Sequence, residues 1–405
     1  MNGLSYLEKL LDGVEIEWLP LSKVLVRTKG TKITAGQMKV LHKEGAPLKI
    51  FAGGKTVALV DFGDIPEKDI NKEPSIIVKS RGVIEFEYYE KPFSHKNEMW
   101  SYYSNDDGIS IKYVYHFLKL NEPHFQNLGS RMQMPQISTP DTDKFQVPIP
   151  CPDNPKKSLE IQAEIVRILD TFTELTTELT TELTARKKQY NYYRDQLLSF
   201  EEGEVEWKAL GKLAGYSQTR ISYTELNGSN YVGVESLLQN RAGKTDSIRT
   251  PESGNVTQYS ANDILIGNIR PYLKKIWYAD RTGGTNGDVL VIHSTDRALN
   301  PRYLYQVLAD DKFFEYNMQH AKGAKMPRGN KPKIMEYLVP IPLASDAEKS
   351  LAEQARIVAI LDKFDALTSS ITEGLPREIE LRQQQYEYYR DLLLSFPKPD
   401  AEVAA

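Results

Sequence analysis

The stretch QYNYYRDQLLSF at residues 189–200 occurs a second time, nearly unchanged, as QYEYYRDLLLSF at residues 385–396. Each copy follows the same two shorter segments, which are VPIP (147–150 and 339–342) and IVRILD or IVAILD (165–170 and 357–362). The offset is 192 residues at VPIP (147 to 339) and 196 at the tyrosines (190 to 386), so the second copy carries four extra residues. A repeat this widely spaced duplicates whole domains, not the small stacked units of a solenoid.

The duplication is permuted along the chain. The segment EIEW at residues 15–18 resembles EVEW at residues 204–207, and residues 6–11 resemble a truncated copy of the helix end at 193–200. The repeat therefore starts partway through a unit. Such a permutation predicts that the two chain ends meet and that the halves form a closed arrangement with circular pseudo-two-fold symmetry.

Each repeated segment is predicted to be a long helix. Apolar residues recur at spacings of three and four from Ile165 to Leu183 and from Ile357 to Ile371, as on one helix face. Ser158 is the expected N-cap of the first helix, and Gly374 and Pro376 should end or kink the second. We expect the two helices to pack on each other as an antiparallel coiled-coil spacer.

The segments between the helices have a different composition. Residues 30–145 and 211–335 are rich in glycine, β-branched residues and tyrosine, with short strand-like runs such as 75–79, 83–88 and 288–292. They share little sequence with each other, so two similar frames hold two dissimilar α+β domains with parallel but distinct tasks. The expected order is a first domain (1–150), a central long helix (151–202), a second domain (203–342) and a C-terminal long helix (343–405).

Composition excludes several classes of protein. The single cysteine cannot form an internal disulfide, and the six histidines lack metal-ligand spacing. No apolar run is long enough to cross a membrane and the N-terminus lacks signal-peptide order, so we expect a cytoplasmic protein. The net charge of -4 disfavours nucleic-acid binding on average, but residues 264–334 hold twelve Lys or Arg against six acids. That segment is suited to phosphate contacts, with a merely solvated surface as the alternative.

Candidate DNA contacts lie in both inserts. Arginine reads guanine and asparagine reads adenine in the major groove, while lysine fixes the register on phosphates. The second insert offers Asn268, Arg270, Tyr272, Lys274, Lys275, Lys322, Lys325, Arg328 and Lys331. The first insert offers Lys79, Ser80, Arg81, His95, Lys96, Asn97, Arg131 and Gln133. A surface salt bridge is the alternative for any one of them.

The tyrosine segments are candidate protein contacts. Tyrosines at helical spacing beside leucines are expected to bury against a partner protein or against the other helix, and less often to stack on bases. The candidate partner-binding residues are Tyr190, Tyr193, Arg194, Leu197, Tyr386, Tyr389, Arg390 and Leu393. Two equivalent surfaces would bind two copies of one partner.

A tandem four-residue unit fills the middle of the first helix, where residues 172–183 read FTELTTELTTEL. Threonine is a mediocre helix former, so helix propensity does not explain it. Each unit would lengthen the helix by ~6 Å, the length of between one and two base pairs at ~3.4 Å each. The segment is interpreted as a ruler between two half-sites, with a spacer of no metric role as the alternative.

Catalytic motifs are not evident. The sequences GGKT at 53–56 and GKT at 243–245 lack the upstream glycine of a phosphate loop, because Lys49 and Leu238 stand there. Arg270-Pro271-Tyr272 does not supply the Asn or Asp, Pro-Pro and aromatic sequence of an amino-methylating enzyme. The sequence thus gives no basis for chemistry or for a metal site.

Together, the permuted frame, the VPIP starts, the helix openings at 162–170 and 354–362 and the YYRD ends resemble the specificity subunit of type I restriction-modification enzymes. The threonine-rich spacer and the helix ends at 187–200 and 376–397 look especially like the type IC group. Residues 259–293 and 322–342 also resemble a recurrent type of recognition domain. The resemblance covers essentially the whole chain.

This resemblance implies two target-recognition domains that each read half of a bipartite double-stranded DNA sequence, and helices that fix the gap between the halves. It further implies two docked modification subunits that methylate adenine N6 with S-adenosylmethionine, and restriction subunits that use ATP and Mg. The chain itself would hold no cofactor. The rivals are a coiled-coil scaffold that binds no DNA and a self-sufficient nuclease or methyltransferase.

Overall fold

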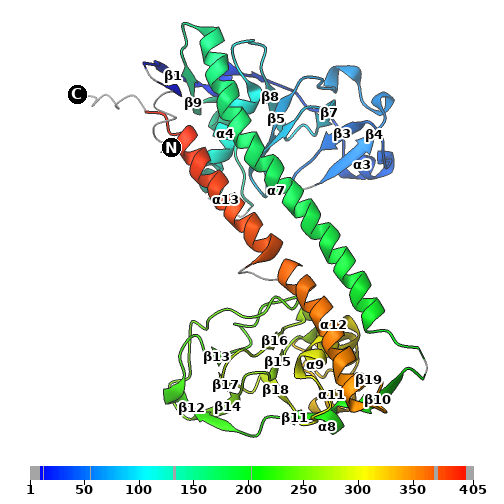
Figure 1. Ribbon diagram of the computed structural model, residues 1–405. Coiled ribbons are helices and arrows are strands. Elements are labelled where there is room, and N and C mark those ends of the chain that lie inside the picture. Colours follow the sequence, from blue (N-terminus) through cyan, green and yellow to red (C-terminus); the bar gives the residue numbers. More distant parts are fainter. Residues whose placement is uncertain are drawn as a thin grey trace. The chain divides into compact units, whose positions relative to one another are not determined.

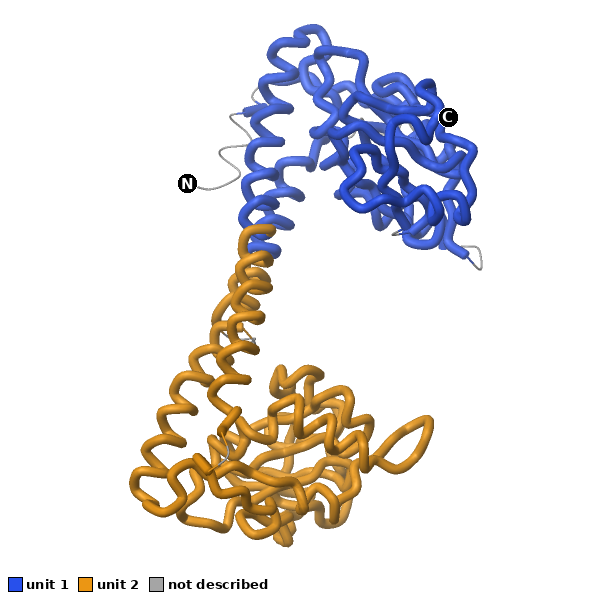
Figure 2. The backbone as a smooth tube through the Cα atoms, turned by 90° about the vertical axis from the view of Figure 1, so that its right-hand side faces the viewer, with its two compact units in different colours: residues 1–176, 382–405 blue, residues 177–381 orange. Residues whose placement is uncertain are grey.

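The computed structural model describes residues 10–11, 13–54, 56–130, 134–201, 203–368 and 373–397. The chain divides into two compact units, one made of residues 1–176 with 382–405 and the other of residues 177–381 (Figure 2). Each unit contains one mixed α/β domain and a part of the long helices (Figure 1).

The domain of the first unit has two sheets. An antiparallel sheet has the order β2 (Val26–Arg27), β8 (Trp100–Tyr103), β5 (Ser75–Lys79) and β6 (Glu85–Tyr89), and a smaller sheet has the order β4 (Val57–Val60), β3 (Leu48–Phe51) and β7 (Phe93–His95). The central strand β5 is buried along its whole length. Helices α4 (Ile111–Leu120) and α5 (Glu122–Gly129) pack on β6, and α3 (Ala35–Leu41) packs on β4. The core therefore lies between the sheets and these helices.

The domain of the second unit also has two sheets. One is antiparallel, in the order β11 (Ala214–Tyr216), β18 (Val289–Ser294), β15 (Ile264–Gly267) and β16 (Ile276–Tyr278). The other has the order β12 (Arg220–Ser222), β14 (Asn255–Tyr259), β17 (Gly283–Thr285) and β13 (Tyr231–Val232). Helices α9 (Pro301–Leu308), α10 (Asp311–Gln319) and α11 (Lys331–Glu336) complete it. The sheet orders differ between the units, as expected for unlike inserts.

Each domain is closed by a two-stranded antiparallel ribbon in the same register. Strand β1 (Ile16–Pro20) pairs with β9 (Gln146–Pro150), and β10 (Val205–Ala209) pairs with β19 (Leu338–Pro342). Trp18 stands opposite Pro148 in the first ribbon, as Trp207 stands opposite Pro340 in the second. The weak repeat at residues 15–18 and the strong one at VPIP are therefore partner strands.

Three long helices carry the repeated frame: α7 (Pro155–Leu197), α12 (Ala347–Thr368) and α13 (Gly374–Leu393). In the first unit the ring of Phe172 on α7 stacks on Tyr389 of α13, with centroids 5.2 Å apart. In the second unit Tyr190 of α7 stacks on Phe364 of α12, at 5.7 Å. The neighbouring helices run in opposite directions in both units. Leu169, which precedes Phe172, shares a core with Leu393, which follows Tyr389, and Leu198, which follows Tyr190, shares a core with Ile357, which precedes Phe364. The helices are thus antiparallel within each unit.

The helix ends differ in one respect from the prediction. Ser158 is not the N-cap of α7, since the helix begins at Pro155 and the side chain of Asn154 accepts the backbone N–H of Lys157 at 3.1 Å. Proline is favoured in the first helical turn, where its missing N–H costs nothing. The predicted interruption of the second helix is confirmed, because α12 ends at Thr368 and α13 begins at Gly374. Ile371 lies outside the described residues.

A buried glutamine clasps each helix to its domain in the same way. The Gln162 Oε1 atom accepts the backbone N–H of Ser110 at 2.8 Å, and Gln354 Oε1 accepts that of Asn300 at 2.8 Å. Each glutamine also donates Nε2 to a backbone carbonyl and to a helix serine. Buried polar groups are stable only when they are paired, so these clasps specify one helix position. The predicted α+β class, with two domains on a duplicated helical frame, is confirmed.

Candidate nucleic-acid interface

The cationic loops of the second unit lie side by side. The chain leaves β15 at Gly267 and passes through a 3-10 turn at Pro271–Leu273, flanked by Arg270 and Lys274 with φ of 53° and 50°. The Arg270 N–H donates to the carbonyl of Pro327 at 2.7 Å, and isolated β-bridges join Ile269 to Arg328 and Lys322 to Arg328. A left-handed conformation at non-glycine residues is strained, and such strain gathers at functional sites. We call residues 268–275 with 321–331 the basic loops.

Part of the predicted set is exposed on the basic loops. Arg270, Tyr272, Lys322, Lys325, Arg328 and Lys331 are exposed. Arg328 also pairs with Asp288 at 3.2 Å. Their cationic and aromatic side chains are able to contact phosphates and bases.

Three other predicted residues are held by the protein itself. Lys274 pairs with Asp311 at 2.8 Å. Lys275 donates to the carbonyl of Val234 at 2.6 Å, and burial lowers the pKa of its ammonium. Asn268 is buried, and its backbone carbonyl accepts the N–H of Gly329 at 3.0 Å. Asn268 therefore links the two segments of the basic loops through its backbone and offers no exposed side chain.

Several candidates in the first unit are buried. Lys79 donates to Glu85 at 2.5 Å and to Glu87 at 2.8 Å. Burial lowers the pKa of Lys79, but the hydrogen bonds and charges of the two glutamates together raise it by more, so that this pKa lies above its usual value. Ser80 donates to the carbonyl of Glu98 at 3.1 Å. His95 is fully buried, and burial lowers its pKa. A buried side chain has no surface to offer a base, so these three residues hold the sheets together in this structure.

The remaining candidates of the first unit are at its surface or outside the description. Arg81 is exposed and contacts Met134, and Asn97 is exposed. Lys96 is partly buried and pairs with Glu98 at 2.5 Å. Arg131 and Gln133 lie outside the described residues.

The tyrosine segments divide into an inward and an outward face. Tyr190 is buried and donates to Asp365 of α12 at 2.6 Å, and Arg194 is buried against Asp310 at 3.2 Å. Leu393 is buried, while Leu197, Tyr386, Tyr389 and Arg390 are partly buried. For Tyr190 the structure realises the second of the two alternatives, burial against the other helix.

Of the outward tyrosines, Tyr193 is a predicted partner contact, whereas Tyr192 and Tyr388 were not among the candidate partner contacts. Tyr192 is 61% exposed and Tyr388, its equivalent, is 60% exposed, while Tyr193 is 41% exposed. The same aromatic residue is exposed to the same extent in both copies, so the duplication extends to the surface. Tyr192 meets Tyr193 edge-on, as Tyr388 meets Tyr389 in the other copy.

Each closing ribbon also borders an apolar pocket at the same place. In the first unit a pocket of about 700 Å³ is lined by Trp18, Phe117, Phe145 and neighbouring residues. In the second unit a pocket of about 630 Å³ is lined by Trp207, Tyr337 and neighbouring residues. Phe145 and Tyr337 correspond, since their carbonyls accept the N–H of Leu21 and Leu210, the first residues after the ribbon strands β1 and β10, both at 2.8 Å.

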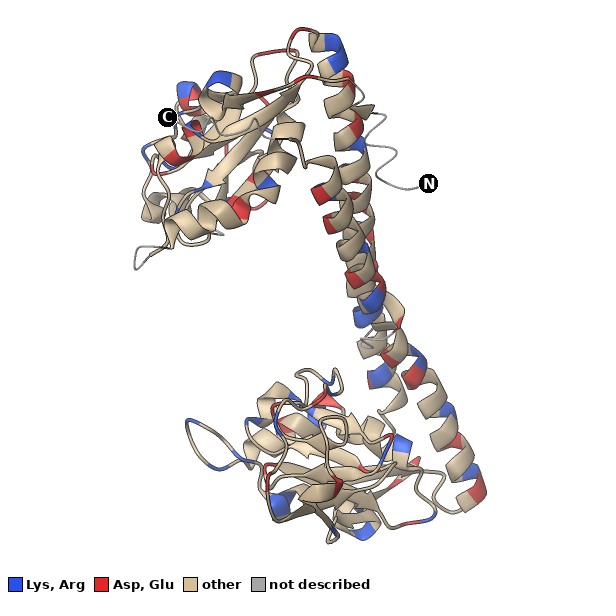
Figure 3. Ribbon diagram, turned by 90° about the vertical axis from the view of Figure 1, so that its left-hand side faces the viewer, with Lys and Arg blue, Asp and Glu red and all other residues tan. Residues whose placement is uncertain are grey.

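Other kinds of site find no support in the described part of the chain. Among those residues, no three or more His, Cys, Asp or Glu side chains are grouped to hold a metal ion. Within the same ranges no helix has both the length and the apolar composition to span a membrane. Along α7, α12 and α13, Asp and Glu are interspersed with Lys and Arg (Figure 3), and residues 168–185 of α7 contain four acids and no Lys or Arg, so the described parts of these helices present no continuous cationic track.

A family model described as the type I restriction modification DNA specificity domain matches residues 32–187 and, a second time, residues 207–381. The chain belongs to this family. The type I restriction enzyme EcoR124I/EcoR124II specificity subunit of Escherichia coli is 38% identical to it, over 99% of each chain. The EcoprrI specificity subunit of Escherichia coli is 33% identical, over 92% of this chain and 93% of its own length.

A solved structure of this family has the same fold. The S subunit of a type I restriction-modification system from M. genitalium superposes with a TM-score of 0.64 at 15% identity, covering 96% of this chain and 98% of its own. The prediction of a non-catalytic specificity subunit is confirmed by the family and by the two relatives. The finer likeness to the type IC group stays a prediction.

Proposed function

We propose that the two domains of this specificity subunit each read one half of a bipartite double-stranded DNA target. The observation that carries the proposal is the contrast between frame and inserts. The frame is duplicated down to single hydrogen bonds, as at Gln162 and Gln354, whereas the sheets that it holds differ in order. One task performed twice on two different sequences requires this combination. We propose residues 1–150 and 203–342 as the reading domains and 151–202 and 343–405 as the helices.

The candidates that are not buried are proposed as the contacts. In the second domain these are the exposed Arg270, Tyr272, Lys322, Lys325, Arg328 and Lys331. In the first domain they are the exposed Arg81 and Asn97 and the partly buried Lys96, together with Arg131 and Gln133, which lie outside the described residues and are proposed from the sequence. Arginine and asparagine supply base recognition, and lysine supplies affinity for phosphate that weakens with salt. Lys79, Ser80, His95, Asn268, Lys274 and Lys275 act by shaping the surface on which the others stand.

The helix α7 is proposed to set the gap between the half-sites. Its threonine-rich stretch is helical throughout, and Thr176 donates to the carbonyl of Phe172 at 2.8 Å, as Thr181 does to Thr177 at 2.9 Å. Bonding four residues back satisfies the hydroxyl within the helix. Threonine units therefore keep their hydroxyls hydrogen-bonded within the helix while they lengthen it, which suits a segment whose property is its length.

Two modification subunits are proposed to dock on the duplicated surfaces. The outward tyrosines Tyr192 and Tyr388 and the pockets beside Trp18 and Trp207 occur once in each half. Aromatic side chains in and around pockets are typical anchors of protein interfaces. S-adenosylmethionine would bind in these modification subunits, and ATP and Mg in the restriction subunits that complete the assembly.

The test is DNA binding by the purified chain with its modification subunits. The proposal requires tight, salt-sensitive binding to a duplex that carries the target, which is found by mapping methylated adenines in a genome that expresses the complex. Arg270→Glu should weaken binding at least tenfold, because it replaces a base or phosphate contact by repulsion. Arg297→Glu is the matched control, since Arg297 is exposed in the same unit and follows the end of β18 that lies away from Gly267, where the basic loops begin. Absence of DNA binding would favour a scaffold, and binding without sequence preference would equally refute the proposal.

A further inference from the structure

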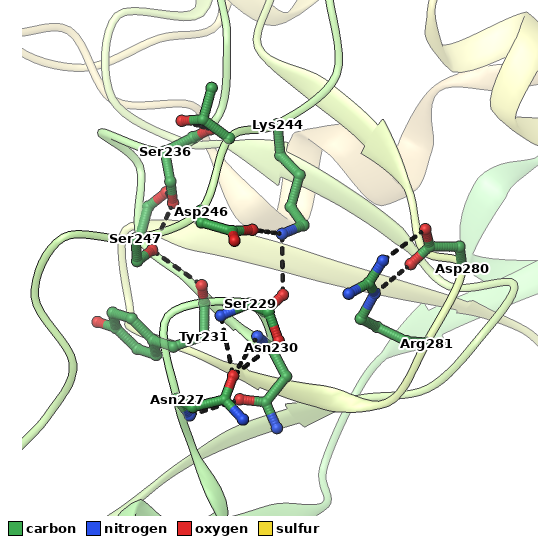
Figure 4. Close-up of polar contacts among 12 residues, drawn as sticks. Asn227, Ser229, Asn230, Tyr231, Ser236, Lys244, Asp246, Ser247, Asp280 and Arg281 are labelled. Carbon is green, nitrogen blue, oxygen red and sulfur yellow. Dashed lines mark hydrogen bonds and ion pairs between the residues drawn. The ribbon is translucent and has the colours of Figure 1, made fainter. Parts of the chain in front are cut away.

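A hairpin of the second domain reaches the basic loops from a different part of the sequence. At its tip Asn240 and Arg241 have φ of 55° and 65°, and the Ala242 N–H donates to the Gln239 carbonyl at 3.3 Å. Two successive positive φ angles are those of a type I′ turn, which glycine normally favours. The base of the hairpin is fixed by a polar network (Figure 4), in which Lys244 donates to the carbonyl of Ser229 at 2.9 Å.

The tip of this hairpin is bonded to the turn that carries Arg270. The Asn240 N–H donates to the carbonyl of Leu273, and the Arg241 N–H donates to that of Lys274, both at 2.9 Å. Four of the non-glycine residues with positive φ therefore meet in one place: Asn240, Arg241, Arg270 and Lys274. Strain of this kind persists only where the surroundings determine the backbone. The hairpin tip thus belongs to the same surface as the basic loops.

Asp311 joins the two cations of this surface. Its Oδ1 atom accepts from Arg241 Nη1 at 2.7 Å and from Lys274 Nζ at 2.8 Å, and Arg241 also donates to the carbonyl of Ala309 at 2.9 Å. Burial acts to raise the pKa of Asp311, but the hydrogen bond from Lys274 and the charge of Arg241 outweigh it, so that this pKa is lowered. The carboxylate is therefore ionised at neutral pH and holds both cations.

We propose that Asp311 is a positioning residue that sets the sequence specificity of the second domain by withholding Arg241 and Lys274 from the DNA backbone. Phosphate contacts add affinity without sequence information. A cation that is paired with Asp311 does not contribute this affinity for DNA of any sequence. The two ion pairs also hold the turn that bears Arg270 in place. The inference rests on the proposed function, because it concerns the same DNA surface.

The test uses Asp311→Asn in the complete complex with modification subunits. Freeing two cations should tighten binding to a duplex of unrelated sequence roughly three- to tenfold at low salt, and steepen the salt dependence by about 0.9 in log–log slope for each freed cation. Mapping of methylated adenines should then show one half of the target becoming degenerate, with the other half and the gap unchanged. A purely structural defect would instead lower methylation at every site alike.

Two control variants separate position from charge. Asp280→Asn makes the same change of charge in the same unit, but Asp280 pairs with the adjacent Arg281, and it should leave both halves of the target intact. Asp311→Glu keeps the carboxylate and should restore discrimination. Adding Arg241→Gln and Lys274→Gln to Asp311→Asn should abolish the gain in non-target affinity.

An unchanged methylation pattern in Asp311→Asn, or the same degeneracy in Asp280→Asn, would overturn the inference while leaving the proposed function intact. A wild-type complex with no sequence preference would overturn both.

Discussion

Arg194 and Arg390 occupy equivalent positions of the duplicated helix ends, yet the structure gives them different surroundings. Arg194 is buried, where its guanidinium bonds Asp310 at 3.2 Å, the Gln306 side chain at 3.0 Å and the Gln306 carbonyl. Arg390 is partly exposed and pairs at 2.7 Å with Asp391, which is itself mostly exposed. The pair thus offers a matched comparison within one chain.

We expect Arg194→Ala to cost about 3–5 kcal/mol of unfolding free energy, because it leaves the Asp310 carboxylate buried without its counter-charge. Arg390→Ala should cost at most about 1 kcal/mol, the ordinary value of an exposed pair. For a unit of this size, ~2–4 °C of Tm is lost per kcal/mol, so the first variant should lose about 6–20 °C and the second roughly 4 °C or less.

Thermal unfolding followed by circular dichroism measures both variants against the wild-type chain. Arg194→Lys serves as an intermediate, since it keeps the charge but loses the planar fork that reaches Asp310 and Gln306 together. Equal losses for Arg194→Ala and Arg390→Ala would show that the buried network does not stabilise the second unit, and would return Arg194 to the list of candidate partner contacts.

Two further predictions concern the length of α7 and the buried His116 that contacts it. Deleting residues 176–179 from α7 should shorten the preferred gap between half-sites by about one to two base pairs, because four residues span ~6 Å. Deleting residues 176–177 instead should abolish binding, since two residues turn the helix by ~200°; a methylated target with the original gap in the first variant would refute the ruler. His116 is buried against Asp170 at 3.0 Å, and burial lowers its pKa from 6.5. Because the unfolded chain takes up this proton more readily, the histidine destabilises the fold as pH falls below about 6.5. His116→Gln copies the equivalent Gln306, which bonds Asp362 at 2.7 Å, and Tm should then fall less between pH 7 and 5.5 than in the wild type; identical pH profiles would contradict this account.

The helical frame was predictable because its segments occur twice in the sequence. Matching segments at 147–150 and 339–342 marked the two copies of the frame, although not their pairing as ribbon strands, and the spacing of apolar residues identified α7 and α12. The helix break at Gly374 was likewise legible, as a glycine followed by a proline two residues later. In each case the signal is local: a short pattern has one conformational meaning.

The inward and outward side chains were less predictable. Tyr190 and Tyr192 are two residues apart, which is about 200° around a helix, and only the packed domain decides which one is buried. Lys79 and His95 are residue types that often contact nucleic acids, but they lie on strands whose side chains are buried on both faces of the sheet. No local sequence pattern predicts that both faces of these strands are buried. Asp311 gave no signal at all, because an acid among cations acquires its meaning only when Arg241, 70 residues earlier in the chain, folds beside it.

Each domain enters and leaves the frame through the two strands of one ribbon, so its first and last residues are neighbours in space. An insertion whose ends are adjacent places no demand on the length or topology of what lies between them. Genetic exchange at these ribbons would therefore replace a whole reading module in one event while the helices and their clasps stay as they were. A specificity subunit could therefore acquire a different recognised sequence by exchange at its two ribbons alone.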